Sequence, residues 1–87
     1  MEENTRGSAE PENLQPLTYG EKAVGLTFNP SGDEKVQKVK ELYAEIIDLL
    51  VSLPIDAKPS ERASLIDFAV REAQSAQMWA VKAITWQ

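Results

Sequence analysis

Apolar residues recur in alternating steps of three and four along two segments of this chain, and this spacing constrains the fold most. In the first segment they are Val36, Val39, Tyr43, Ile46, Leu50 and Leu53, and in the second Ile66, Ala69, Ala73, Ala76, Ala80 and Ala83. Such spacing places the residues on one face of an α-helix. We therefore predict an all-α fold, an antiparallel helical hairpin with helices over residues 32–53 and 61–85.

Larger apolar side chains form a second stripe on the later helix, beside its row of alanines. This stripe includes Leu65, Phe68 and Trp79. Two apolar stripes on one helix exceed what a single hairpin partner can cover. A chain of 87 residues is also near the lower size limit at which one core stabilises a monomer. We therefore expect the hairpin to assemble into a helical homo-oligomer.

The residues before the first predicted helix divide into two parts. Residues 1–19 are polar and acidic and show no apolar period, which is typical of a flexible segment. Glycines and Pro30 punctuate the following stretch, but Val24, Leu26 and Phe28 are too apolar to be left in water, so we predict an ordered loop. The sequence thus favours a flexible acidic segment over residues 1–19 and a hairpin domain over residues 20–87.

Serines precede both predicted helices. Ser31 followed by Glu34 has the pattern of a capping box, in which the two residues satisfy each other's backbone N–H groups. Ser60 follows Pro59 and is well placed to cap the second helix. We expect the helices to begin just after these two serines.

The composition excludes several kinds of chemistry. The chain has no Cys and no His, so thiolate nucleophiles, imidazole bases and Cys/His zinc sites are excluded. No spaced Asp/Glu motif suggests a metal site, and we predict a non-enzymatic protein without a metal or cofactor. A net charge of −5 argues against binding along a DNA backbone. No apolar run is long enough to cross a membrane and no secretory signal is evident, so we expect a cytoplasmic protein.

The junction FNPSGDEKVQKVK is the best candidate for a binding site, because an aromatic residue and a polar loop lead directly into a helix N-terminus. Such an end readily accepts phosphate. Phe28 can stack on a base, Asn29 offers a donor and an acceptor, and Lys40 can reach an anion from the edge of the apolar face. Phe28 also fits a hydrophobic staple, and Asn29 with Ser31 also fits a plain turn and cap.

The stretch GEKAVGLTFNPSGDEKVQKVKELYAEIIDLL, with AQMWAVKAIT in the second helix, resembles the helical hairpin family shared by phage anti-CBASS sponges and part of the anti-Thoeris sponges. The resemblance covers about residues 20–85. It implies an oligomer, typically a hexamer, acting in the cytoplasm of the infected host. Its pockets between protomers would bind a cyclic dinucleotide, a cyclic trinucleotide or a cyclic ADP-ribose isomer without cleaving it.

By this resemblance, Phe28 stacks on a base and Lys40 pairs with phosphate, and Arg71 is the nearest candidate for a separate trinucleotide site. Arg71 also fits an ordinary surface ion pair. Two other functions stay open. The apolar stripes suit an adaptor that binds another helix, and a metal-dependent phosphodiesterase would use acids such as Asp33, Glu34 and Glu41.

Overall fold

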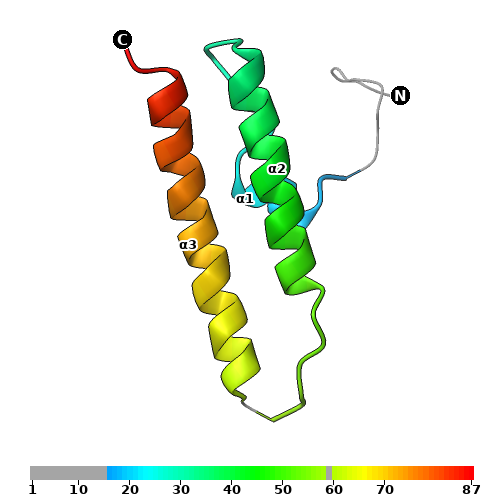
Figure 1. The fold of residues 1–87 in the computed structure, drawn as a ribbon. Coiled ribbons are helices and arrows are strands. Elements are labelled where there is room, and N and C mark those ends of the chain that lie inside the picture. The colour runs from blue at the N-terminus through cyan, green and yellow to red at the C-terminus, as the bar shows by residue number, and fades with distance from the viewer. Residues whose placement is uncertain (1–15, 59) are drawn as a thin grey trace, which may run out of the picture.

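The computed structural model describes residues 16–58 and 60–87, and in these residues the chain is a helical hairpin with one additional short helix (Figure 1). The helices are α1 (Tyr19–Ala23), α2 (Glu34–Val51) and α3 (Glu61–Ile84), and the described residues form no strand. Helices α2 and α3 run antiparallel, side by side, and α1 packs against α2. The predicted all-α hairpin is confirmed, and the homo-oligomer stays a prediction.

The predicted start of the first long helix is wrong by two residues. Its N-cap is Asp33, whose carboxylate accepts a hydrogen bond from the Lys35 N–H at 2.7 Å. Ser31 instead accepts a hydrogen bond from the Asp33 N–H, within the loop before the helix. The prediction for the second long helix is confirmed, because Ser60 caps α3 and accepts from the Ala63 N–H at 3.2 Å.

Helix α1 lies where the sequence predicted only a loop. Thr18 and Glu21 form a capping box around its first turn. Gly20 then fixes α1 against α2, because its N–H donates to the Asp48 carboxylate at 2.7 Å. A Cβ at Gly20 would lie 2.2 Å from the carbonyl oxygen of Ala44, so only glycine permits this approach.

Residues 1–15 of the predicted flexible segment lie outside the described residues. Of its last four residues, Thr18 caps α1 and Tyr19 begins it. The division into residues 1–19 and 20–87 stays a prediction.

The apolar core lies in the middle of the hairpin, where all three helical segments meet. Val24, just after α1, packs there with Ala44 and Ile47 of α2 and with Val70 of α3. Ile47 is fully buried. This core positions the loop over residues 24–33 relative to both long helices.

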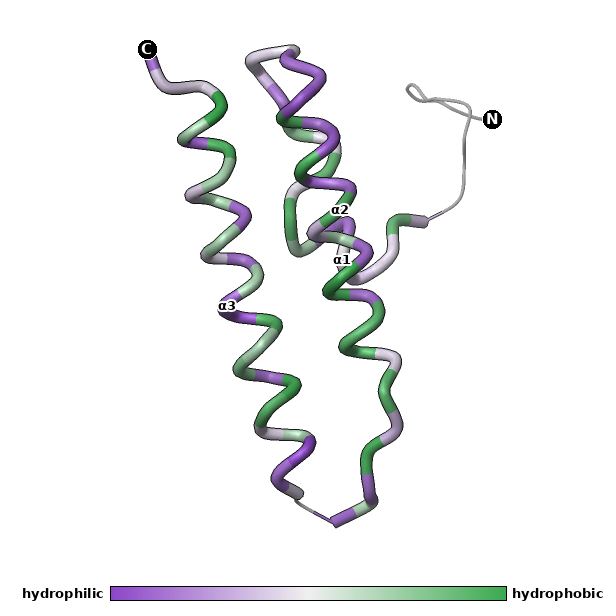
Figure 2. Tube along the Cα trace, viewed as in Figure 1, coloured by the Kyte–Doolittle hydropathy of each residue, from purple (hydrophilic) through white to green (hydrophobic). Residues whose placement is uncertain are grey.

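The inward-facing residues are shifted by one position from parts of the predicted apolar faces. On α2, Ile47 is buried while its neighbour Ile46 is 46% exposed. On α3, the buried residues are Val70 and Gln77. Figure 2 shows that hydrophobic and hydrophilic residues alternate along both long helices. The shift matters because it brings polar side chains to the inward face.

The second apolar stripe of α3 stays uncovered in the single chain. Its large side chains are more than half exposed, namely Leu65, Phe68, Met78 and Trp79. Helix α2 thus covers the face of α3 that contains Val70 and Gln77 and leaves these larger side chains uncovered. Within the described residues, no helix is both long and apolar enough to span a membrane.

Candidate ligand-binding groove

A groove of about 500 Å³ lies at the open end of the hairpin, where α2 begins and α3 ends. The loop before α2, the first turns of α2 and the last turns of α3 line it. Four of the five predicted site residues come together here: Phe28, Asn29, Ser31 and Lys40. The fifth, Arg71, does not line the groove. Gln77, Met78, Val81 and Thr85 complete it from α3.

Lys40 brings a positive charge to an inward-facing position of α2. Its side chain is buried, at 6% exposure, and Nζ donates to the carbonyl oxygen of Gly25 at 3.0 Å and to that of Phe28. Gly25 has a positive φ of 64°, which glycine adopts without steric cost. The ion pairs found in the described part of the chain involve Lys35 and Arg71 rather than Lys40. An ammonium group has three donors, so Lys40 retains one for an anion.

Phe28 presents an open aromatic surface at the same place. Its side chain is 70% exposed, and the Lys40 Nζ lies 5.6 Å from the centre of the ring. The expectation that Phe28 is kept from water together with Val24 and Leu26 is wrong for the single chain, because only Val24 is buried and Phe28 projects outward. This exposure does not fit a hydrophobic staple or a core residue. The groove therefore combines an accessible ring with a nearby ammonium group, which suits a ligand that has a flat base and a phosphate.

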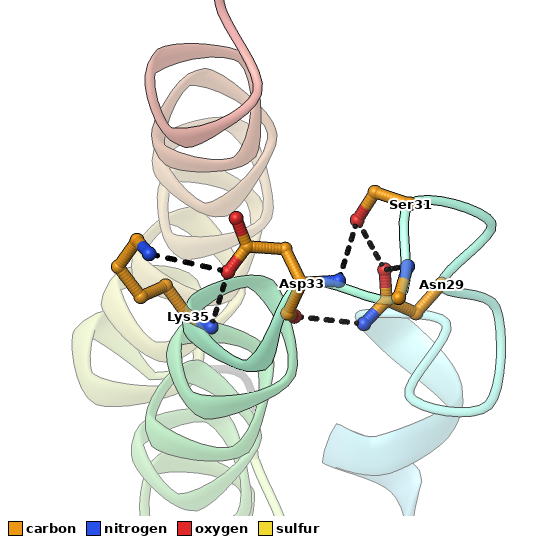
Figure 3. A network of polar contacts seen from close by, with 5 residues as sticks. Asn29, Ser31, Asp33 and Lys35 are labelled. Atoms are coloured by element: carbon orange, nitrogen blue, oxygen red, sulfur yellow. Dashed lines mark hydrogen bonds and ion pairs between the residues drawn. The ribbon is translucent and has the colours of Figure 1, made fainter.

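Asn29 and Ser31 hold the loop in shape (Figure 3). The Asn29 carboxamide oxygen accepts from the Ser31 hydroxyl at 2.7 Å and from the Gly32 N–H at 3.2 Å, while its amide donates to the Asp33 carbonyl at 3.1 Å. The Asp33 carboxylate also accepts from Lys35. Because a carboxylate already occupies the N-terminus of α2, this end is a poor place for a second anion, and the Lys40 ammonium group is the better placed one to attract an anion.

The sequence analysis missed the groove residues of α3, and Gln77 is the buried polar one among them. It lies on the inward face of α3 and is 5% exposed. Its position continues the alternating steps of four and three through Ile66, Val70 and Ala73, a spacing that identifies an inward-facing residue whatever its polarity. A search for apolar residues alone passes over it.

The family model of the Acb2/Tad1 hairpin domain matches residues 21–85. This chain belongs to the Acb2/Tad1 hairpin family. The family is associated with anti-CBASS and anti-Thoeris sponges, and it is a binding domain rather than an enzyme family. The matched range contains α2, α3 and all the described groove residues. No curated protein and no solved structure is significantly similar to the chain.

Arg71 lies elsewhere on this member of the Acb2/Tad1 hairpin family. It is on the exposed face of α3, where its Nε contacts the Asp67 carboxylate at 3.3 Å, one helical turn away. The Arg71 side chain is 74% exposed. This is the surface ion pair that the sequence left open as an alternative, and a ligand role for Arg71 stays a prediction.

Asp33 and Glu41, two of the acids that a metal-dependent phosphodiesterase would use, lie in different surroundings. Asp33 caps α2, whereas Glu41 lines a separate hollow with Glu21 and Glu45. Among residues 16–58 and 60–87, no group of three or more His, Cys, Asp or Glu side chains is arranged to hold a metal ion. The groove itself offers aromatic stacking, an ammonium group and amide hydrogen bonds.

Proposed function

We propose that this protein binds cyclic oligonucleotide immune messengers and sequesters them uncleaved, so that the CBASS or Thoeris effectors of an infected host are not activated. The observation that carries the proposal is the groove, in which a chain of the Acb2/Tad1 hairpin family combines the exposed Phe28 ring with the Lys40 ammonium group. Sequestration requires tight binding and an abundant protein, but no catalytic residue.

Phe28 stacks on a base of the ligand, and Lys40 uses its remaining N–H to bind a phosphate oxygen. A stacked base contributes about 1–3 kcal/mol, and a hydrogen bond to a charged group about 1.5–3 kcal/mol. One such pair of contacts is well short of the roughly 12 kcal/mol that nanomolar affinity requires. A cyclic dinucleotide has two bases and two phosphates, so two copies of the groove supply two sets of contacts. Asn29 and Ser31 position the loop, and Asn29 retains one amide N–H for the ligand.

We further propose that the protein assembles into a homo-oligomer, a hexamer as in the related sponges, which brings grooves of different protomers together. The uncovered apolar side chains Leu65, Phe68 and Trp79 support this proposal, because exposed apolar patches of this kind mark interaction sites. The same surface supports the second candidate function, an adaptor that binds a helix of another protein.

Calorimetric titration with a panel of cyclic dinucleotides, cyclic trinucleotides and cyclic ADP-ribose isomers tests the function. We expect at least one member to bind with submicromolar affinity. Because Phe28 is exposed, replacing it should disturb the fold little. The Phe28→Ala variant should lose binding while keeping the helical content and oligomer mass of wild type. If nothing in the panel binds, the adaptor function is favoured instead.

A second measurement separates a sponge from an enzyme. The protein is incubated with a binding ligand, separated from free ligand by filtration and denatured, and the released ligand is analysed by chromatography. A sponge returns intact cyclic nucleotide in an amount limited by the number of grooves. Linear product beyond that stoichiometry, with magnesium or manganese added, contradicts sequestration.

A further inference from the structure

The side-chain amide of Gln77 is buried in the groove without a hydrogen-bond partner in the described part of the chain. Its exposure is 5%, and no hydrogen bond of this side chain is found within residues 16–58 and 60–87. A glutamine amide has two N–H donors and one carbonyl acceptor. Buried polar side chains are nearly always paired, and an exception needs an explanation. Because Gln77 lines the groove, a bound ligand is a ready source of the missing partners.

The surroundings of Gln77 favour a specific contact. Met78 and Val81 line the groove from the same helix, and Val36 lines it from α2. A hydrogen bond among such apolar side chains is stronger than one in water. Lys40 enters the groove from α2 and Phe28 from the loop, so the phosphate and stacking contacts already have other providers. Thr85 also lines the groove, but its hydroxyl already donates to the Val81 carbonyl at 2.8 Å. The Gln77 amide is therefore the group on α3 that can both donate to and accept from the edge of a base.

We propose that Gln77 binds the N7 edge of an adenine base and thereby sets a preference for adenine-containing cyclic nucleotides, an inference that rests on the proposed function. Adenine has an amino donor beside a ring-nitrogen acceptor, and a glutamine amide pairs with that arrangement through two hydrogen bonds. On its N7 edge, adenine presents the 6-amino donor beside the N7 acceptor. Guanine presents two acceptors on the same edge, where the amide satisfies one bond only. The N1 edge would not separate the two bases in this way, because guanine also has a donor beside an acceptor there, so the preference follows from binding at the N7 edge.

The first test compares Gln77→Met with wild type and with Gln74→Met, using 3′,3′-cyclic di-AMP and 3′,3′-cyclic di-GMP as ligands. Methionine keeps the length of the side chain and removes its donors and acceptor. Gln74 is on the same helix, is half-buried and does not line the groove. We expect wild type and Gln74→Met to bind cyclic di-AMP about tenfold more tightly than cyclic di-GMP. Gln77→Met should lose about tenfold in affinity for cyclic di-AMP and show no preference.

The second test changes the ligand and leaves the protein intact, so its result does not depend on how the variant folds. The ligand is a cyclic dinucleotide of purine riboside, which lacks the 6-amino groups of adenine. Wild type should bind it about tenfold more weakly than cyclic di-AMP, and Gln77→Met should bind both equally.

If wild type binds cyclic di-AMP and cyclic di-GMP equally, the assignment of Gln77 is wrong. It is also wrong if Gln77→Met binds cyclic di-AMP as tightly as wild type does. Both results leave the proposed function standing. If wild type binds no cyclic nucleotide of the panel, the proposed function is itself wrong, and the wild-type titrations show this before any variant is measured.

Discussion

The middle of the hairpin and its open end use the same two helices but fill the space between them differently. In the middle, Val24, Ile47 and Val70 pack into an apolar core. At the open end, the buried inward-facing positions include Lys40 on α2 and Gln77 on α3. The first region gains free energy by burying apolar surface, whereas the second buries polar groups at a cost. The difference indicates that the middle holds the fold together, and it supports the proposal that the open end binds the ligand.

The two regions are connected through the loop before α2. Val24 packs in the core, and the next residue, Gly25, supplies a carbonyl acceptor for Lys40. Phe28 supplies the other acceptor and the exposed ring. The core thus anchors one end of the loop, and the Asp33 cap anchors the other. Substitutions in the middle should act on stability, and substitutions at the open end should act on binding.

Ile47→Ala should have the largest effect on stability. Ile47 of α2 is fully buried in the core with Val24 and Val70, and truncating such a side chain leaves a cavity that typically costs about 2–5 kcal/mol. Urea unfolding followed by circular dichroism measures the loss. The matched control is Ile46→Ala, since Ile46 is the adjacent residue and is 46% exposed. An equal loss in both variants would show that Ile46 is also buried, as it would be at an interface between copies.

Lys40→Met should weaken ligand binding strongly and change the stability of the fold only slightly. The variant removes the ammonium group, so affinity for cyclic di-AMP should fall about 10- to 100-fold, the equivalent of one hydrogen bond to a charged group. Removing a buried charge relieves its desolvation cost but leaves the carbonyls of Gly25 and Phe28 without this donor. We therefore expect the free energy of unfolding to change by only about 1 kcal/mol.

Lys38→Met is the control for Lys40→Met, because Lys38 is on the same helix and exposed. It should keep wild-type affinity and stability. Calorimetry gives the affinities and urea unfolding the stabilities. If Lys40→Met binds like wild type, Lys40 is a structural residue that only holds the loop.

The two long helices were predictable because their apolar spacing extends over several turns, and Ser60 was predictable as a cap because it directly precedes α3. Helix α1 was not predictable from spacing. It has only five residues, and the contact that fixes it joins Gly20 to Asp48, 28 positions apart in the sequence. Ser31 and Asp33 are both good capping residues, and the sequence alone does not decide between them.

The groove was predictable in part. Phe28, Asn29, Ser31 and Lys40 lie in one stretch of 13 residues, so their proximity follows largely from local sequence. Gln77 is on α3, and only the register of α3 against α2 brings it into the groove. That register also places Arg71 outside the groove.

Arg71→Gln should have the smallest effect of these substitutions. The Arg71 side chain is 74% exposed, and its ion pair with Asp67 is one that solvent screens, so stability should change by less than about 0.5 kcal/mol. Because Arg71 does not line the groove, affinity for cyclic di-AMP should stay within about twofold of wild type, well below the tenfold that 1.4 kcal/mol represents. The same calorimetric panel measures both cyclic di- and trinucleotides. A loss of affinity confined to trinucleotides would assign Arg71 to a separate site on the exposed face of α3. A loss of affinity for cyclic di-AMP would mean that residues outside the groove also contribute to binding of the dinucleotide.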